Sequence, residues 1–221
     1  MNAAPRVSVV VVSRDRPGPL SRCLTALTQL DYAPFEVIVA ADDAGLAAVA
    51  ALGLADAVKS VRVEAPGISA ARNAGVAIAA GDVVAFIDDD AVAEPTWLTH
   101  LATPFAESGV EAAGGYVRGR NGISFQWRAR SVNRQAVHAD LPPADSTPRL
   151  LPPPPDGAIR TEGTNMAFRR ETLAAMGGFD TGFRFFLDET DLNMRLAGAG
   201  ALTAVVPLAQ VHHGFAPSPR R

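Results

Sequence analysis

Short apolar runs alternate with amphipathic segments through about the first ninety residues of the chain. The runs 7–12, 36–41, 61–63 and 83–87 are too short for typical helices, and their β-branched residues predict buried strands. The segments between them that read as helices are 17–30, 45–57 and 68–80. This alternation predicts an α/β fold with a single doubly wound, mostly parallel sheet, right-handed crossovers and helices on both faces.

Acidic residues follow the predicted strands at the point where each strand ends. They are Asp15, Asp42, Asp43, Asp88 and Asp90. Ligands of doubly wound sheets bind in the crevice beyond the carboxyl ends of the strands. Arg72 enters from a helix start on the same side. The convergence of these side chains predicts a binding site at this edge of the sheet.

Three consecutive carboxylates, Asp88, Asp89 and Asp90, end the fourth strand. They repel one another at neutral pH unless a cation lies among them. In an extended chain Asp88 and Asp90 share a face, while Asp89 points elsewhere. Two hard oxygen ligands on one side suit Mg²⁺ or Mn²⁺ with a phosphate as co-ligand. The alternative is a solvated acidic turn.

The second half of the chain has a less regular pattern. Its predicted elements are a helix over 95–106, a strand and turn over 109–122, a helix over 124–137, a strand over 162–168 and a helix that begins at an acidic cluster near 188–191 and runs to about 199. The intervening segment 141–157 holds seven prolines, which exclude a helix and disfavour a strand. This segment is either an idle linker or a lid that orders over substrate.

A second acidic cluster begins the last predicted helix. Asp191 and Arg195 are four residues apart and can pair, and Asp188 can cap the helix. Glu189 follows the apolar run 185–187, whose surroundings could raise the pKa of Glu189 and suit it to proton abstraction. The alternative for Glu189 is a solvated acid at a helix start.

Composition narrows the range of function classes. The chain has 221 residues, a net charge of -3 and 48% hydrophobic residues, which indicates a folded protein without a nucleic-acid partner. Its one cysteine, Cys23, excludes an internal disulfide. Neither an 18-residue apolar span nor a signal-peptide layout is present, so we expect a cytoplasmic protein and leave peripheral membrane contact open.

Two nucleotide-binding signatures are missing from the first strand's loop. Neither G-x-G-x-x-G nor G-x-x-x-x-G-K-[ST] occurs, which argues against a dinucleotide oxidoreductase and a P-loop NTPase. Without a glycine nest, a bound diphosphate needs another source of positive charge. A metal held by carboxylates is the obvious one.

Six motifs together resemble the inverting glycosyltransferases of family 2, which have the GT-A fold. In order they are Val7 to Pro17, the Asp42-Asp43 strand end, Ala71-Arg72-Asn73-x-Gly75, Gly81 to Asp90, Gly163-Thr164-Asn165-Met166 and Asp188-Glu189-Thr190-Asp191-Leu192. The resemblance covers about positions 6–214. It implies that residues 1–110 form a nucleotide-sugar-binding half and residues 111–221 an acceptor-binding and catalytic-base half of the same domain.

The resemblance also implies a role for individual residues. Glu189 falls at the position of the catalytic base. Asp90 falls at the metal position of the D-x-D motif, and His212 or His213 matches a late histidine that completes the metal shell. The implied donor-side residues are Ser13, Asp15, Asp42, Asp43, Arg72, Asp88 and Asp89. The implied acceptor-side residues are Gly163, Thr164, Asn165, Asp188 and Asp191.

The implied reaction moves a sugar from a nucleoside-diphosphate sugar to an acceptor hydroxyl with inversion, assisted by Mn²⁺ or Mg²⁺. The acceptor is a glycan, a lipid-linked molecule or a small molecule. Two departures stand out: the second strand ends Ala41-Asp42-Asp43-Ala44, and a Glu occupies the base position where Asp is commoner. The alternatives are a sugar nucleotidyltransferase and a non-catalytic nucleotide-sugar-binding module. The arginines at 118, 120, 128 and 130 either hold an anionic acceptor or form a solvated face.

Overall fold

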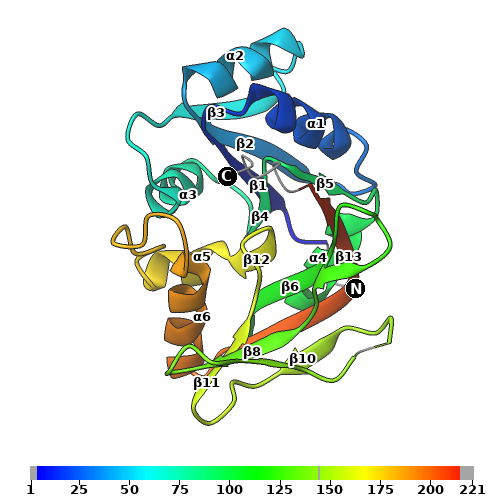
Figure 1. Ribbon diagram of the computed structural model, residues 1–221, viewed down its shortest axis with the longest axis vertical. Helices are drawn as coiled ribbons and strands as arrows, with labels where there is room; N and C mark the ends of the chain where they lie inside the picture. The colour runs from blue at the N-terminus through cyan, green and yellow to red at the C-terminus, as the bar shows by residue number, and fades with distance from the viewer. Residues whose placement is uncertain (1–3, 144, 215–221) are drawn as a thin grey trace, which may run out of the picture.

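The computed structural model describes residues 4–143 and 145–214, and its centre is a large mixed sheet flanked by helices (Figure 1). The strands of this sheet are β1 (Val7–Ser13), β2 (Phe35–Ala41), β3 (Val58–Arg62), β4 (Val83–Asp88), β5 (Ala91–Ala93), β6 (Val110–Arg118), β7 (Phe125–Trp127), β10 (Arg149–Leu151), β12 (Asn165–Arg169) and β13 (Leu202–His213). A smaller sheet contains β8 (Arg130–Asn133), β9 (His138–Asp140) and β11 (Gly157–Arg160). The helices are α1 (Pro17–Leu27), α2 (Asp43–Ala51), α3 (Ile68–Ala77), α4 (Trp97–Ala102), α5 (Arg170–Ala175) and α6 (Asp188–Gly198), with a 3₁₀ turn at Thr103–Ala106.

The central sheet joins a parallel first half to a mixed second half. Its order is β10-β13-β6-β12-β4-β1-β2-β3, with β5 on β13 and β7 on β6. Strands β3, β2, β1 and β4 are mutually parallel, as the alternating pattern predicts. β12 then pairs antiparallel with β4 and with β6. The two halves of the chain therefore share one continuous sheet.

Alternate residues of the central strands support two separate apolar layers. Val7, Val9 and Val11 of β1 pack in the layer that contains α1, α2 and α4. Val10 faces the opposite layer, which contains α5 and α6. The predicted doubly wound fold with helices on both faces is therefore confirmed. Among the helices of the described residues, none combines the length and apolar character needed to cross a membrane.

The segment 124–137 is not the predicted helix. It contains β7 and β8, joined by a short connection. Val117 of β6 pairs with Trp127 of β7, so that pairing across a turn decides the local structure. Weak local helical preference is overridden when a neighbouring strand offers backbone partners.

The proline-rich segment also contains a strand that the sequence did not predict. Arg149 to Leu151 form β10, which pairs antiparallel with β13 through Arg149 and Val205. Pro148 and Pro152 flank these three residues. Because β10 is at the edge of the sheet, the prolines can lie just outside the ladder without removing a needed donor.

A buried amide fixes the strands in the middle of the sheet. Asn165 of β12 is fully buried; its Nδ2 donates to the carbonyls of Tyr116 at 3.0 Å and Ala209 at 2.9 Å. The indole of Trp97 donates to Asn165 Oδ1 at 2.8 Å. One side chain thus connects four elements, which are α4, β6, β12 and β13. All three of its hydrogen bonds are buried.

We expect Gly115→Ala to disrupt this meeting point. A Cβ at Gly115 would lie 2.0 Å from the Ala209 carbonyl oxygen and 2.4 Å from Asn165 Nδ2, so the backbone or the amide has to move. The expected loss is at least about 2 kcal/mol of unfolding free energy, measured by urea denaturation. Gly18→Ala in α1 is the matched control, because its Cβ meets nothing within 4 Å. Equal stability of the two variants would contradict this account.

Candidate active site

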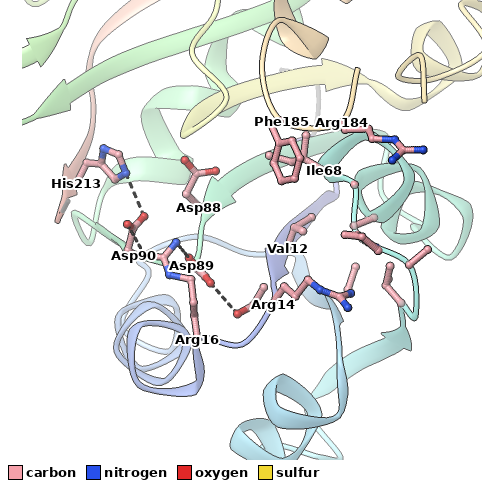
Figure 2. Close-up of a pocket in the computed structure, with 17 residues that line it drawn as sticks. Val12, Arg14, Arg16, Ile68, Asp88, Asp89, Asp90, Arg184, Phe185 and His213 are labelled. Carbon is pink, nitrogen blue, oxygen red and sulfur yellow. Dashed lines mark hydrogen bonds and ion pairs between the residues drawn. The ribbon is translucent and has the colours of Figure 1, made fainter. Parts of the chain in front are cut away.

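A cavity of about 340 Å³ lies beyond the carboxyl ends of the parallel strands (Figure 2). Its wall includes the ends of β1 and β4 and the chain that enters α3. The polar residues in this wall are Ser13, Arg14, Arg16, Asp88, Asp89, Asp90, Arg184 and His213. Ile68 and Phe185 contribute apolar surface on the opposite side in Figure 2. The cavity thus combines an acidic end with an apolar end.

Asp89 anchors the acidic end to the fold. Its side chain is buried, accepts a hydrogen bond from Ser13 Oγ at 2.7 Å and pairs with Arg16 at 2.8 Å. Burial raises the pKa of Asp89 to about 6, although Ser13 and Arg16 oppose the shift. Asp89 therefore fixes the loop after β1 against the end of β4.

Asp88 and Asp90 converge with His213 on the other side of the same turn. One ligand atom from each of the three residues lies within 4.8 Å of the others. His213 Nε2 is 3.0 Å from Asp90 Oδ1, and its Nδ1 is 3.0 Å from Gln126 Oε1. Two carboxylates and an imidazole form a donor set that suits Mn²⁺ or Mg²⁺. Figure 2 shows His213 and Asp90 joined at one end of the cavity.

His212 lies apart from this group. Its ring nitrogen Nε2 pairs closely with Glu94, while its neighbour His213 reaches Asp90. Successive residues of β13 point to opposite faces, which separates the two imidazoles. Of the two histidines considered as metal ligands from the sequence, His213 is the one that lies beside Asp88 and Asp90.

Hydrogen bonds shift the pKa values of Asp90 and His213 at the acidic end of the cavity. Burial disfavours the ionised form of Asp90, but the bonds from His213 and from Arg16, at 2.6 Å, prevail and hold the pKa of Asp90 below its usual range. Burial lowers the pKa of His213, yet Asp90 more than reverses this and raises it. Because a metal binds the neutral imidazole, protons compete with a cation at this site.

Arg72 connects the D-x-D turn to the start of α6. Its side chain is buried, pairs closely with Asp188, and lies 3.7 Å from Asp88 Oδ1. It also donates to the Gly163 carbonyl at 3.2 Å. Arg72 is thus behind the cavity wall rather than in it. The buried Asp188, which could have been a helix cap, is instead its partner.

The turn before β12 approaches Asp88 from the second half of the chain. Thr164 Oγ1 donates a close hydrogen bond to Asp88 Oδ2, and Gly163 accepts from Arg72. Asn165 lies inside the sheet. Asp191 pairs with Arg195 at 2.7 Å, as its spacing predicts. Of these four predicted acceptor-side residues, Thr164 bonds directly to the D-x-D turn, and Gly163 is connected to it through Arg72.

Asp15, Asp42 and Asp43 lie outside the main cavity, around a neighbouring open hollow that Arg14 and Arg62 also line. Asp42 caps α2 by accepting from Gly45 N at 3.0 Å, which lowers the pKa of Asp42. It also accepts from the Asp15 backbone at 2.8 Å. Asp43 is exposed and pairs with Arg62 at 2.9 Å. Asp42, rather than Asp43, therefore holds the loops after β1 and β2 together.

Glu189 is buried in the first turn of α6, and Arg160 donates to its Oε1 at 2.9 Å. Burial favours the neutral acid, but the bond from Arg160 prevails and lowers the pKa of Glu189. The expectation that the run 185–187 raises this pKa is wrong. Those three apolar side chains are exposed, so they do not desolvate the carboxyl group.

The model of glycosyl transferase family 2 matches residues 8–177 of the sequence. The chain belongs to glycosyl transferase family 2. The D-x-D turn, the turn before β12 and most of the cavity wall fall within the matched residues. Arg184, Phe185 and His213 of the wall, together with α6 and β13, follow them.

Curated relatives carry glycosyltransferase names. Glucosyl-dolichyl phosphate glucuronosyltransferase of Haloferax volcanii is 29% identical over 191 residues, which cover 80% of this chain and 56% of the relative. Pre-mycofactocin glycosyltransferase of Mycobacterium tuberculosis is 27% identical over 216 residues, 94% of this chain and 42% of the relative. This chain thus spans about half the length of these relatives.

Solved glycosyltransferase structures share the fold. The mannosyltransferase PcManGT of Pyrobaculum calidifontis, in complex with GDP-Man and Mn²⁺, matches with a TM-score of 0.70 and 18% identity over 98% of this chain and 59% of that one. GalNAc-T7 with UDP, GalNAc and Mn²⁺ matches with a TM-score of 0.77 and 18% identity over 97% of this chain and 45% of that one. The GT-A fold expected from the sequence motifs is confirmed.

Among the residues that sequence reasoning missed, Arg16 and Arg160 form ion pairs with predicted site residues, and Glu162 forms one with Arg160. Arg16 pairs with Asp89 and Asp90, and Arg160 pairs with Glu162 and Glu189. Arg16 could have been predicted as a site residue, because it lies in the loop after the first strand. Arg160 carries no local signal, because its partner Glu189 is 29 residues away in the sequence, and Glu162 is connected to the site through its ion pair with Arg160.

We expect Arg72→Met to destabilise the family 2 domain, because it leaves the Asp188 carboxylate buried without its cation. Breaking a buried pair in this way costs roughly 3–5 kcal/mol. The double variant Arg72→Met/Asp188→Leu removes both charges and is expected to recover most of the loss. The measurement is the free energy of unfolding of the two single variants and the double variant. Additive losses would show that the two residues do not act as a pair.

Proposed function

We propose that this chain transfers a sugar from a nucleoside-diphosphate sugar to an acceptor hydroxyl, with inversion and with the assistance of a divalent metal. The observation that carries the proposal is the Asp88–Asp90–His213 group at one end of a cavity of about 340 Å³. Family membership and the glycosyltransferase names of the relatives support the reaction class. Two structural neighbours were solved with Mn²⁺ together with a nucleotide sugar, or with a nucleotide and a sugar, which supports the donor class.

The residues present fit a divalent metal. Asp88, Asp90 and His213 would hold Mn²⁺ or Mg²⁺, leaving other positions for phosphate oxygens. The metal's chemistry is to supply positive charge that stabilises the diphosphate as it leaves. Arg16, which already pairs with Asp89 and Asp90, is part of the same charged surface. The diphosphate would thus lie at the acidic end of the cavity, with the base and ribose toward Ile68 and Phe185.

Glu189 supplies the base for the reaction. Its carboxylate takes the proton from the acceptor hydroxyl while that oxygen bonds to the anomeric carbon and the bond to the diphosphate oxygen breaks. A single displacement inverts the anomeric centre. Arg160 keeps Glu189 ionised in its buried position, so the carboxylate is ready to accept a proton at neutral pH. Residues 111–221 would bind the acceptor. Residues 1–110, together with Phe185 and His213 from the second half, would bind the donor.

We expect Glu189→Gln to remove proton abstraction while keeping the shape of the side chain. Transfer should fall by about 10²–10⁴-fold, the usual contribution of a general base. Donor affinity should stay within about twofold, because Glu189 lies on α6, outside the cavity wall. Turnover would be followed with nucleotide-sugar donors, and donor binding by calorimetry. Full turnover by this variant would exclude Glu189 as the base, and absence of transfer by the unaltered chain would favour a binding module.

The two adjacent histidines provide a matched pair for the metal site. We expect His213→Ala to weaken Mn²⁺-dependent binding of a nucleoside diphosphate by about tenfold or more, because one ligand is lost. His212→Ala should leave this binding unchanged, since His212 pairs with Glu94 on the opposite face. A thermal-shift titration of each variant with UDP and GDP, with and without Mn²⁺, measures the difference. Equal effects of the two substitutions would count against the ligand assignment.

A further inference from the structure

A buried charge cluster lies behind Glu189 and is not explained by the proposed reaction. Arg160, at the end of β11, places Nη2 2.9 Å from Glu189 Oε1 and 3.3 Å from Glu162 Oε2. All three side chains are largely buried, with 13% or less of each exposed. One guanidinium nitrogen is therefore divided between two carboxylates, only one of which is the base.

The cluster is held rigidly from three sides. Strand β11 pairs with β8, which places Arg160 opposite Arg130. The Arg160 guanidinium also stacks over the Trp127 ring, 5.5 Å from its centroid. Glu162 begins a tight turn in which the backbone N–H of Asn165 donates to the backbone carbonyl of Glu162 at 2.8 Å. Backbone pairing therefore fixes the positions of both residues, and the Trp127 ring restricts the Arg160 side chain.

The hydrogen bonding of the cluster is incomplete. Arg160 Nε and Glu162 Oε1 are buried, and neither forms a hydrogen bond within the described part of the chain. Both residues border a small cavity of about 10 Å³, which also touches Gly114 and Gly115. A purely structural ion pair normally satisfies its buried atoms, and groups that fail to do so call for another explanation. The Arg160–Glu162 pair therefore retains unused hydrogen-bonding capacity.

The charges that face Glu162 come from several elements. Burial raises the pKa of Glu162 to about 7; Glu189 and Asp88 add to the shift, while Arg160 and Arg130 oppose it. Glu189 faces Arg160 and Asp188, and its pKa is lowered. Burial and the cations Arg160 and Arg130 lower the pKa of the nearby His138, so His138 adds no charge at neutral pH. Near pH 7, Glu162 is therefore the member of the cluster that changes charge.

We propose that Glu162 is a positioning residue for the base: by competing for Arg160, it controls how tightly Arg160 holds the Glu189 carboxylate. This proposal rests on the proposed function of Glu189. When Glu162 is ionised, Arg160 is shared and Glu189 binds a proton more readily. When Glu162 is neutral, Arg160 serves Glu189 alone and makes it a weaker base. Glu162 makes no contact with the acceptor: its charge acts on Glu189 through the shared Arg160 and, in the same direction, through repulsion between the two carboxylates.

The transfer reaction tests this proposal through its pH dependence. In the unaltered chain, kcat should rise about three- to tenfold as pH passes through 7, because ionised Glu162 strengthens the base. Glu162→Gln carries no charge, so this rise should disappear and any acidic limb should move to lower pH. KM for the donor should stay the same. Glu162→Asp keeps the charge and should restore part of the rise.

A control separates this effect from general loss of an ion pair. Glu111→Gln removes a carboxylate that lies 3.7 Å from Arg169, outside the cavity and the cluster. It should leave the pH profile unchanged. A Glu162→Gln profile that superimposes on that of the unaltered chain would overturn the proposal. A uniform drop in kcat at every pH, with the rise near pH 7 preserved, would overturn it as well.

A second readout does not depend on activity. In chain labelled with ¹³C at the Glu carboxyl groups, one resonance should titrate near pH 7 and disappear in Glu162→Gln. The resonance assigned to Glu189 by its loss in Glu189→Gln should then titrate at lower pH. An unmoved Glu189 resonance would overturn the proposal. Coupled titration in a chain that transfers no sugar would instead reject the proposed function and leave the link between Glu162, Arg160 and Glu189 standing.

Discussion

Three arginines hold the site together, and each is shared between two carboxylates. Arg16 pairs with Asp89 and Asp90, and Arg72 with Asp88 and Asp188. Arg160 pairs with Glu162 and Glu189. Acids outnumber cations two to one in this set, so none of the three arginines can neutralise both of its partners. The surplus negative charge is a reason for the site to accept a divalent cation and a proton.

The three arginines also join parts of the chain that are distant in sequence. Arg16 fixes the loop after β1 to the end of β4, and Arg72 fixes α3 to the start of α6. The turn at Gly163 and Thr164 contacts both Arg72 and Asp88. The D-x-D turn and Glu189 are therefore linked through a few buried side chains, and a change in one pair is felt by the next. These contacts connect residues of the first part of the chain to residues after 160.

The first half of the fold could be predicted because its signals are local. Continuous Val and Ile runs specify buried strands, and residues at their ends share one edge of a parallel sheet. The second half depends on pairing between distant segments. β7 and β10 form because β6 and β13 offer backbone partners, although their own sequences favour other structures. Arg160 and Glu162 escaped prediction for the same reason: only the folded chain brings them to Glu189.

Neighbouring acids in the sequence have different roles because the fold gives them different partners. Asp89 points inward, meets Ser13 and Arg16, and is partly neutral near pH 6, whereas Asp90 faces His213 and stays ionised. Asp188 and Glu189 differ in the same way, since one meets Arg72 and the other Arg160. Neighbouring acids therefore differ in burial and in ionisation, and the proposed metal ligand Asp90 and the proposed base Glu189 are in each case the acid whose pKa is lowered. Arg16 contacts both Asp89 and Asp90, so Ser13 and His213 distinguish these two acids, whereas Arg72 and Arg160 distinguish Asp188 from Glu189.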